Sequence, residues 1–226
     1  MVPQHYSRDI PERCEALLRD LLPIVERGGA KYGDPLQTTF LLAMATPMIV
    51  LPVERLMKPF NTGDIGVAED VPLCDDSGEL VAEVFGEGKL FCRASAFFKP
   101  GHWSGKARVP RFNVAEHWPR RWLDDLASPE AYDRAGKATA WRVIKDLRNA
   151  LAHGGVTYLD ADGRHTEGEV AMLGFASAIC FEPGGRNLKK VNLLRIHQDH
   201  FRIFLSAWAE WLKKARVVEL LERRAA

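Results

Sequence analysis

The segment 140–155 constrains the fold more than any other part of the chain. Apolar residues recur there at three- and four-residue spacings, at Ala140, Val143, Ile144, Leu147 and Leu151. This is the stripe of an amphipathic helix that packs one face against a core. Gly154 and Gly155 follow, and glycine adopts the left-handed conformation that ends helices without a Cβ penalty. The pattern therefore predicts a helix that stops at His153.

The last turns of this helix carry Arg148, Asn149 and His153. His153 would lie where the negative end of the helix dipole favours a cation, and imidazole is the usual general acid or base. A guanidinium is suited to phosphate. Residues five apart point roughly 140° from each other, so two such helices meeting across a two-fold axis would bring Arg148 and His153 together more easily. An ordinary helix end with a solvated Arg148 and a favourable terminal cation is the alternative.

Residues 146–155, Asp-Leu-Arg-Asn-Ala-Leu-Ala-His-Gly-Gly, resemble the signature of HEPN domains (higher eukaryotes and prokaryotes nucleotide-binding). That family ends a helix with an Arg, a polar residue, a short apolar run and a His. The resemblance implies an all-α bundle of about four helices, usually a homodimer. Many members are metal-independent endoribonucleases, often toxins or phage-defence effectors, and others are non-catalytic binding modules. The resemblance implies Arg148 and His153 as catalytic residues and Asn149 as a substrate contact.

Apolar periodicity and helix caps predict three more helices, at about 10–27, 34–58 and 198–223, beside the motif helix at about 128–153. We therefore expect a mainly α fold, a HEPN-like four-helix bundle with β-hairpin insertions. The chain would form a single domain, residues 1–226. Its core helices would span about 10–58 and 128–223, with an insertion at about 60–127.

Several segments have the character of strands rather than helices. Residues 79–85 and 89–98 flank the turn Gly86-Glu-Gly88 and predict a hairpin within the insertion. Turn residues also bound 156–159, 170–181 and 190–196, which predict further strands. These strands would decorate the helical bundle.

Basic and aromatic residues are interspersed over residues 99–122. Lys106, Arg108 and Arg111 lie there among the rings of Trp103, Phe112, Trp118 and Trp122. Such a segment could follow an RNA backbone and stack unpaired bases, so these three cations are candidate substrate-binding residues. A solvated loop whose tryptophans pack on the bundle is the other interpretation.

Composition and residue spacing limit which partners, metals and cofactors can be expected. The chain has 226 residues and a formal net charge of +1, which argues neither for nor against a nucleic acid partner. Its four cysteines are scattered without metal-ligand or redox spacing, which indicates free thiols in a reducing cytoplasm.

His197 and His200 are three residues apart but lack further ligands at a characteristic spacing, so a capping or surface role is favoured over a metal site. Glycine-rich phosphate motifs are absent, and no cofactor, metal or membrane segment is expected.

The sequence thus predicts a cytoplasmic endoribonuclease of HEPN type that needs no metal. His153 would move the proton, Arg148 would hold the scissile phosphate, and attack by the ribose 2′-OH would leave a 2′,3′-cyclic phosphate. Its expected partners are RNA, a second copy of the chain and, for a toxin, a nucleotidyltransferase-type antitoxin. A non-catalytic HEPN-like interaction module, or an RNA-binding module that uses residues 99–122, is the alternative.

Overall fold

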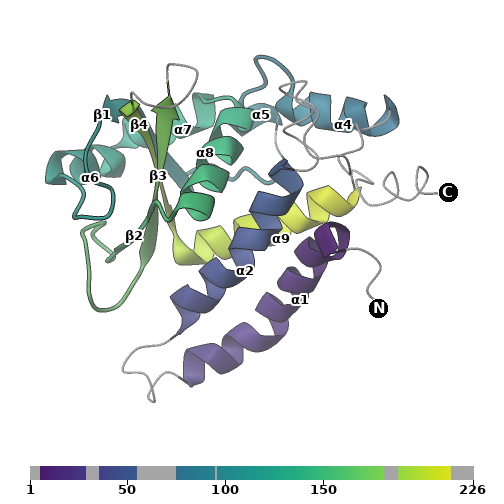
Figure 1. Cartoon of the computed structure of the whole chain (residues 1–226), viewed down its shortest axis with the longest axis horizontal. Coiled ribbons are helices and arrows are strands. Elements are labelled where there is room, and N and C mark those ends of the chain that lie inside the picture. The colour runs from purple at the N-terminus through teal and green to yellow at the C-terminus, as the bar shows by residue number, and fades with distance from the viewer. Residues whose placement is uncertain (1–5, 29–35, 55–74, 95, 181–187, 215–226) are drawn as a thin grey trace.

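The described part of the chain folds around a four-stranded antiparallel sheet (Figure 1). The computed structural model describes residues 6–28, 36–54, 75–94, 96–180 and 188–214. The helices are α1 (Tyr6–Arg27), α2 (Gln37–Pro52), α4 (Asp75–Phe85), α5 (Phe91–Ala94), α6 (Arg120–Ala127), α7 (Pro129–Lys137), α8 (Ala140–His153) and α9 (Gln198–Lys214). The strands are β1 (Trp103–Pro110), β2 (Val156–Leu159), β3 (Met172–Cys180) and β4 (Leu188–His197).

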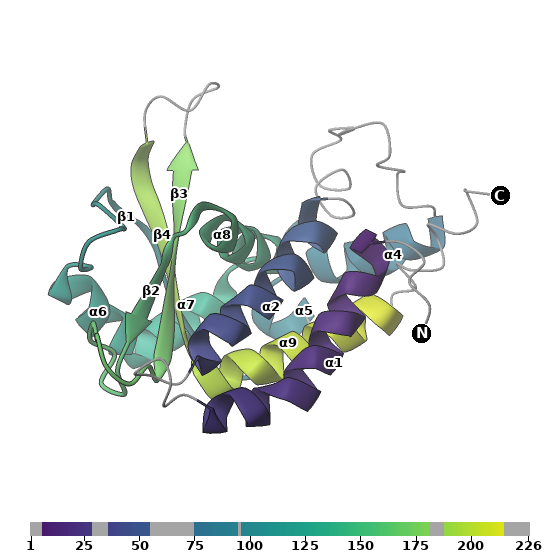
Figure 2. The same cartoon turned by 60° about the horizontal axis from the view of Figure 1, so that its bottom comes forward.

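The strand order in the sheet is β1-β4-β3-β2, and each neighbouring pair is antiparallel. Figure 2 shows the sheet nearly edge-on, with α6 on one side and α8 and α2 on the other, and with α1 farther out beyond α2. β2 follows α8 directly and forms one edge of the sheet, whereas β1 forms the opposite edge. Two strands therefore separate the end of the motif helix from the strand that carries Lys106.

Side chains of β4 alternate between two cores, as the two-residue period of a strand requires. Leu194 and Ile196 are buried in the large core that the sheet forms with α2, α8 and α9. Val191 and Leu193 are buried in the smaller core on the face that α6 covers. Because both faces are covered, the sheet lies in the interior and the helices pack around it.

A β-bulge in β1 changes which core its side chains enter. Trp103 belongs to the large core and Val109 to the smaller one, although an unbroken strand would place both on one face. The register against β4 shifts between Lys106 and Val109, and Arg108 adopts a positive φ of 56°. The bulge turns the chain at Arg108 so that the second half of β1 faces α6.

The prediction of a four-helix bundle is wrong, because the sheet and not a set of helices forms the centre of the fold. The strands predicted at 156–159, 170–181 and 190–196 are confirmed, yet they pair with β1 into one layer instead of decorating a bundle. The hairpin predicted at 79–98 is also wrong, because residues 75–85 are helical. Val81, Val84 and Phe85 are all buried, and their three- and four-residue spacing is helical.

Helices are confirmed at the other predicted places, with one break. The helix predicted at 128–153 is two helices, because the backbone of Ala138 and Thr139 is extended between α7 and α8. The Thr139 side chain accepts a hydrogen bond from the N–H of Arg142 and so caps the start of α8. Residues 55–74 lie outside the described residues; they include the end of the helix predicted at 34–58 and the start of the predicted insertion. Residues 215–223 of the last predicted helix also lie outside the described residues.

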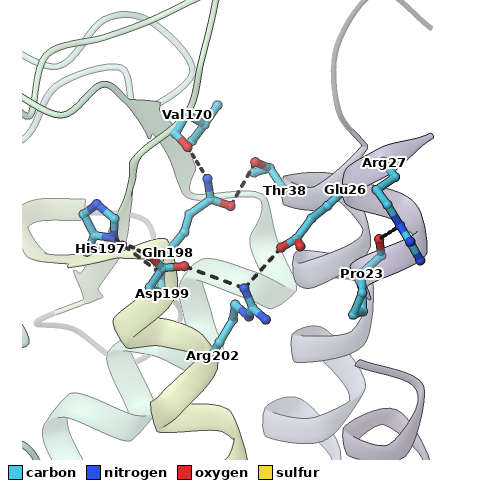
Figure 3. A network of polar contacts seen from close by, with 9 residues as sticks. All are labelled: Pro23, Glu26, Arg27, Thr38, Val170, His197, Gln198, Asp199 and Arg202. Carbon is cyan, nitrogen blue, oxygen red and sulfur yellow. Dashed lines mark hydrogen bonds and ion pairs between the residues drawn. The ribbon is translucent and has the colours of Figure 1, made fainter. Parts of the chain in front are cut away.

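Polar contacts attach α9 to the two N-terminal helices, and Figure 3 shows them. Gln198 accepts a hydrogen bond from the Thr38 hydroxyl at 2.9 Å and donates to the carbonyl of Val170. Arg202 forms an ion pair with Glu26 of α1 at 3.2 Å. No helix within the described ranges is long and apolar enough to cross a membrane.

Candidate active site on helix α8

Arg148 is turned inward from α8 towards the end of α2. One terminal nitrogen of its guanidinium forms an ion pair with Glu54, and the other donates to the Asn149 side chain at 2.6 Å. Its Nε is buried and has no hydrogen-bond partner among the described residues. The guanidinium is thus held in place on two sides, and its buried Nε–H is not used.

Asn149 continues this chain of contacts into the sheet. Its amide donates to the Ser177 hydroxyl of β3 at 3.2 Å, and Ser177 also hydrogen-bonds Asp146, one turn earlier on α8. Asp146 accepts a second hydrogen bond from the Asn192 amide of β4 at 2.8 Å. We call the six linked residues the polar network: Glu54, Asp146, Arg148, Asn149, Ser177 and Asn192.

The polar network ends at the bulge of β1. The Asn192 side-chain oxygen accepts a hydrogen bond from the backbone N–H of Arg108 at 3.0 Å, so the amide of Asn192 bridges β1 and α8. Buried polar groups are costly unless they are hydrogen-bonded, and these contacts satisfy both ends of the Asn192 amide. The orientation of α8 on the sheet therefore depends on polar as well as apolar contacts.

Burial raises the pKa of Asp146 to about 6, because the ionised carboxylate is taken out of water. Hydrogen bonds from Ser177 and Asn192 and the positive charge of Arg142, 3.9 Å away, oppose this effect without cancelling it. The carboxyl of Asp146 consequently changes its protonation state near neutral pH, inside the helix that carries the motif.

We expect Asp146→Asn to remove a pH dependence of stability. The carboxyl is neutral in both states below its unfolded pKa of 3.8, and the folded state alone keeps the proton from there up to about 6. The free energy of unfolding should therefore fall as pH rises through this window, by on the order of 3 kcal/mol. Urea unfolding of the wild type and the variant at pH 4, 5, 6 and 7 measures the difference. Parallel curves for the two proteins would contradict the expectation.

His153 lies at the other end of the motif, exposed in the last turn of α8. Gly154 follows in the left-handed conformation with φ 71°, and its N–H returns to the Ala150 carbonyl, which confirms the predicted helix stop. No hydrogen bond or ion pair joins Arg148 to His153 in the part of the chain that is described. The guanidinium points to α2, and the imidazole lies at the capped helix end.

The three cations predicted to bind substrate lie apart from these residues. Lys106 forms an ion pair with Asp125 of α6 and lies over the ring of Trp122, 4.9 Å from its centroid. Arg108 forms the bulge, and Arg111 is exposed just after β1. All three are at the β1 edge of the sheet, opposite the β2 edge to which His153 leads. Trp103 and Trp118 are core residues and cannot stack on a base.

Sequence reasoning assigned no role to Glu54, Asp146, Ser177 or Asn192. A signal was present for two of them, since Ser177 and Asn192 interrupt apolar strand sequences and each lies two residues from a buried apolar side chain, Phe175 and Leu194 respectively. A lone polar residue on the buried face of a strand needs a partner. Which partner it has depends on the packing of α8, which the sequence does not reveal.

His197 and His200 show no sign of a metal site. Within the described residues, no group of three or more His, Cys, Asp or Glu side chains is placed to hold a metal ion. His200 instead stacks on His102 of the loop before β1, with ring centroids 3.7 Å apart and planes 2° from parallel.

Comparison with known proteins adds no relative. The chain matches no protein-family model, no curated protein and no solved structure. The resemblance to HEPN domains therefore depends on residues 146–155 and on the helix end that they form.

Proposed function

We propose that this protein is a metal-independent endoribonuclease whose catalytic groups are His153 and Arg148 of α8. The observation that carries the proposal is the arrangement of α8 itself. The capped helix end exposes the imidazole of His153, while Glu54 and Asn149 hold a guanidinium on the same helix. The HEPN-like order of Arg, polar residue and His supports the same assignment.

His153 would transfer the proton that the cleavage reaction requires. As a base it takes the proton from the ribose 2′-OH, whose oxygen attacks the adjacent phosphorus and displaces the 5′-oxygen of the next nucleotide. The protonated His153 then gives this proton to the leaving 5′-oxygen, and the products are a 2′,3′-cyclic phosphate and a 5′-hydroxyl end. Because the nucleophile belongs to the substrate, the scheme calls on no metal-bound water.

Arg148 would bind the scissile phosphate and stabilise the negative charge that grows on it in the transition state. The side chain now pairs with Glu54, so the phosphate has to compete with that carboxylate for the guanidinium. Asn149 would hold the guanidinium in position through its 2.6 Å hydrogen bond. Within one chain Arg148 and His153 diverge, and we therefore include a two-fold dimer in the proposal.

The test of the proposal is incubation of the purified chain with total RNA and with tRNA in EDTA. We expect discrete fragments whose 3′ ends resist ligation until a phosphatase that opens cyclic phosphates has acted. Light scattering at the assay concentration measures the oligomeric state. A monomer that cleaves RNA at the full rate would contradict the two-fold dimer.

Arg148→Ala should lower the cleavage rate by about 10²- to 10³-fold, because one preorganised donor to a charged transition state is lost. Its ion pair with Glu54 is mostly buried, with side chains 21% and 30% exposed, so the variant should also lose stability, by about 1–3 kcal/mol. Arg148→Lys is the matched variant, since it keeps the charge without the planar fork and should recover part of the rate. Cleavage by Arg148→Ala at the wild-type rate would remove Arg148 from the mechanism.

A further inference from the structure

Ser177 is a buried polar residue of β3, and the proposed reaction gives it no role. Its side chain is 2% exposed, and its hydroxyl bonds two residues of α8. It accepts a hydrogen bond from the Asn149 amide at 3.2 Å and donates one to the Asp146 carboxylate. A hydroxyl has one proton to donate and lone pairs to accept, so both functions of the group are used. Ser177 therefore links a buried carboxylate to the residue beside Arg148.

The carboxylate of Asp146 sets the direction of these hydrogen bonds. An ionised carboxylate can only accept, so it takes the Ser177 proton and leaves the Ser177 oxygen to accept from the Asn149 NH2 group. The Asn149 amide thereby turns its oxygen to Arg148, which donates to it at 2.6 Å. A flipped amide would point its NH2 group at the guanidinium, and two donors would face each other.

The bulge of β1 fixes the other side of Asp146. The side-chain oxygen of Asn192 accepts the backbone N–H of Arg108, so its NH2 group is left for Asp146, to which it donates at 2.8 Å. A neutral amide or a protonated carboxyl at position 146 would give its acceptor oxygen to Asn192 and turn a donor towards Ser177. The direction of the hydrogen bonds between Asp146 and Arg148 thus depends on the negative charge of Asp146.

Charged groups around Asp146 oppose the effect of its burial. Arg142, whose Nε is 3.9 Å away, and Lys145 lie on the same helix and favour the ionised form. β3 contains no charged residue, β4 carries Lys190 on the same face, and α2 presents Glu54 at the far end of the polar network. Burial is the larger influence and raises the pKa of Asp146 to about 6. The directing charge is therefore present above this pH and is lost as the pH falls through it.

We infer that Ser177 and Asp146 are positioning residues of the proposed ribonuclease. They fix the amide of Asn149, and this amide fixes the guanidinium that binds the scissile phosphate. The inference rests on the proposed function, in which the phosphate competes with Glu54 for that guanidinium. Once Glu54 is displaced from one terminal nitrogen, the hydrogen bond from the other to Asn149 is the described contact that still holds the Arg148 side chain.

The first test is a double-mutant cycle in the RNA cleavage assay. Ser177→Ala should lower the rate about ten- to one-hundredfold, because a 1 Å misplacement at a reacting centre can cost about 10²-fold. In the Arg148→Ala background the same substitution should cause no further loss, because Ser177 acts through Arg148. Ser177→Thr, which keeps the hydroxyl, should recover most of the rate. Ser104→Ala is the matched control, since Ser104 is also buried in the sheet and its hydroxyl has no hydrogen-bond partner among the described residues.

The second test observes Arg148 without RNA. Its Nε–H is buried and should give a slowly exchanging NMR signal, which Arg148→Lys identifies by its absence. We expect this signal to shift with a midpoint near pH 6 in the wild type and to broaden in Ser177→Ala. In Asp146→Asn the shift near pH 6 should disappear, because the titrating carboxyl is gone.

The third test compares the pH dependence of cleavage by the wild type and Asp146→Asn. The wild type should be faster above pH 6, and the ratio of the two rates should approach one as the pH falls below this value, because both proteins then carry a neutral group. The titration of His153 is common to both proteins and cancels in the ratio.

Three outcomes would overturn the inference: an equal loss from Ser177→Ala with and without Arg148, an Nε–H signal that Ser177→Ala leaves unchanged, or a rate ratio that does not vary with pH. Failure of the proposed function is seen separately, as wild-type protein that leaves RNA intact. The NMR experiment then still shows whether Ser177 holds Arg148. Thermal melting of each variant shows that it is folded.

Discussion

His153→Ala should abolish RNA cleavage, with a loss of about 10²- to 10⁴-fold in rate, the usual cost of removing a general acid or base. The variant should remain folded, because the side chain is exposed at the end of α8 and buries little surface. Loss of its interaction with the helix dipole should cost at most about 1 kcal/mol. Single-turnover cleavage of labelled RNA in EDTA measures the rate, and circular dichroism measures the melting temperature.

Two controls sharpen this experiment. His197→Ala removes an imidazole that is 39% exposed at the end of β4 and should cleave at the wild-type rate. Added imidazole should restore part of the activity of His153→Ala, because a free base can occupy the vacated position. If wild-type protein leaves RNA intact with and without divalent ions, the enzyme proposal fails and a non-catalytic interaction module takes its place. Cleavage by His153→Ala at the full rate would also reject His153 as the catalyst.

Trp208→Ala should destabilise the protein by about 3–5 kcal/mol, the usual cost of deleting a large core side chain. Trp208 is fully buried, its ring lies 5.1 Å from that of Phe97, and its indole N–H donates to the Met48 carbonyl at 2.9 Å. The substitution opens a cavity where α9 meets α2 and leaves that carbonyl without its partner. For a domain of this size the melting temperature should fall by roughly 6–20 °C.

Ile203→Ala provides the comparison on the same helix. Ile203 is 46% exposed, so its truncation should change the free energy of unfolding by no more than about 0.5 kcal/mol. Chemical unfolding of both variants, followed by circular dichroism, measures the two effects. Similar losses at the two positions would mean that α9 is not packed through the face that carries Trp208.

Local patterns were enough to predict most of the elements. Ser128 and Pro129 start α7 as their side chains predict, and Gly154 ends α8 with a positive φ. These features depend on contacts within one turn of a helix, so a few neighbouring residues determine them. The strand predicted at 156–159 is confirmed for the same reason, since turn residues bound it on both sides.

The wrong predictions at 79–98 and 128–153 came from sequence patterns that are compatible with more than one secondary structure. Residues 79–85 are rich enough in Val and Phe for a strand, but their burial follows the period of a helix in α4. The break between α7 and α8 was missed, because Thr139 is a helix cap within a sequence that otherwise continues the helical pattern. In the first case tertiary contacts outweighed a weak local preference.

The sequence by itself determined the motif helix, its stop at Gly154 and the order of Arg148, Asn149 and His153 along it. Only the tertiary structure decided that α8 packs on a sheet, that Arg148 pairs with Glu54, and that Asn149 reaches Ser177. It also brought His117 against His165 and placed residues 114–117 beside β2. The physical reason is that sheet pairing and side-chain contacts join residues far apart in the chain, and their free energy depends on packing that no local pattern encodes.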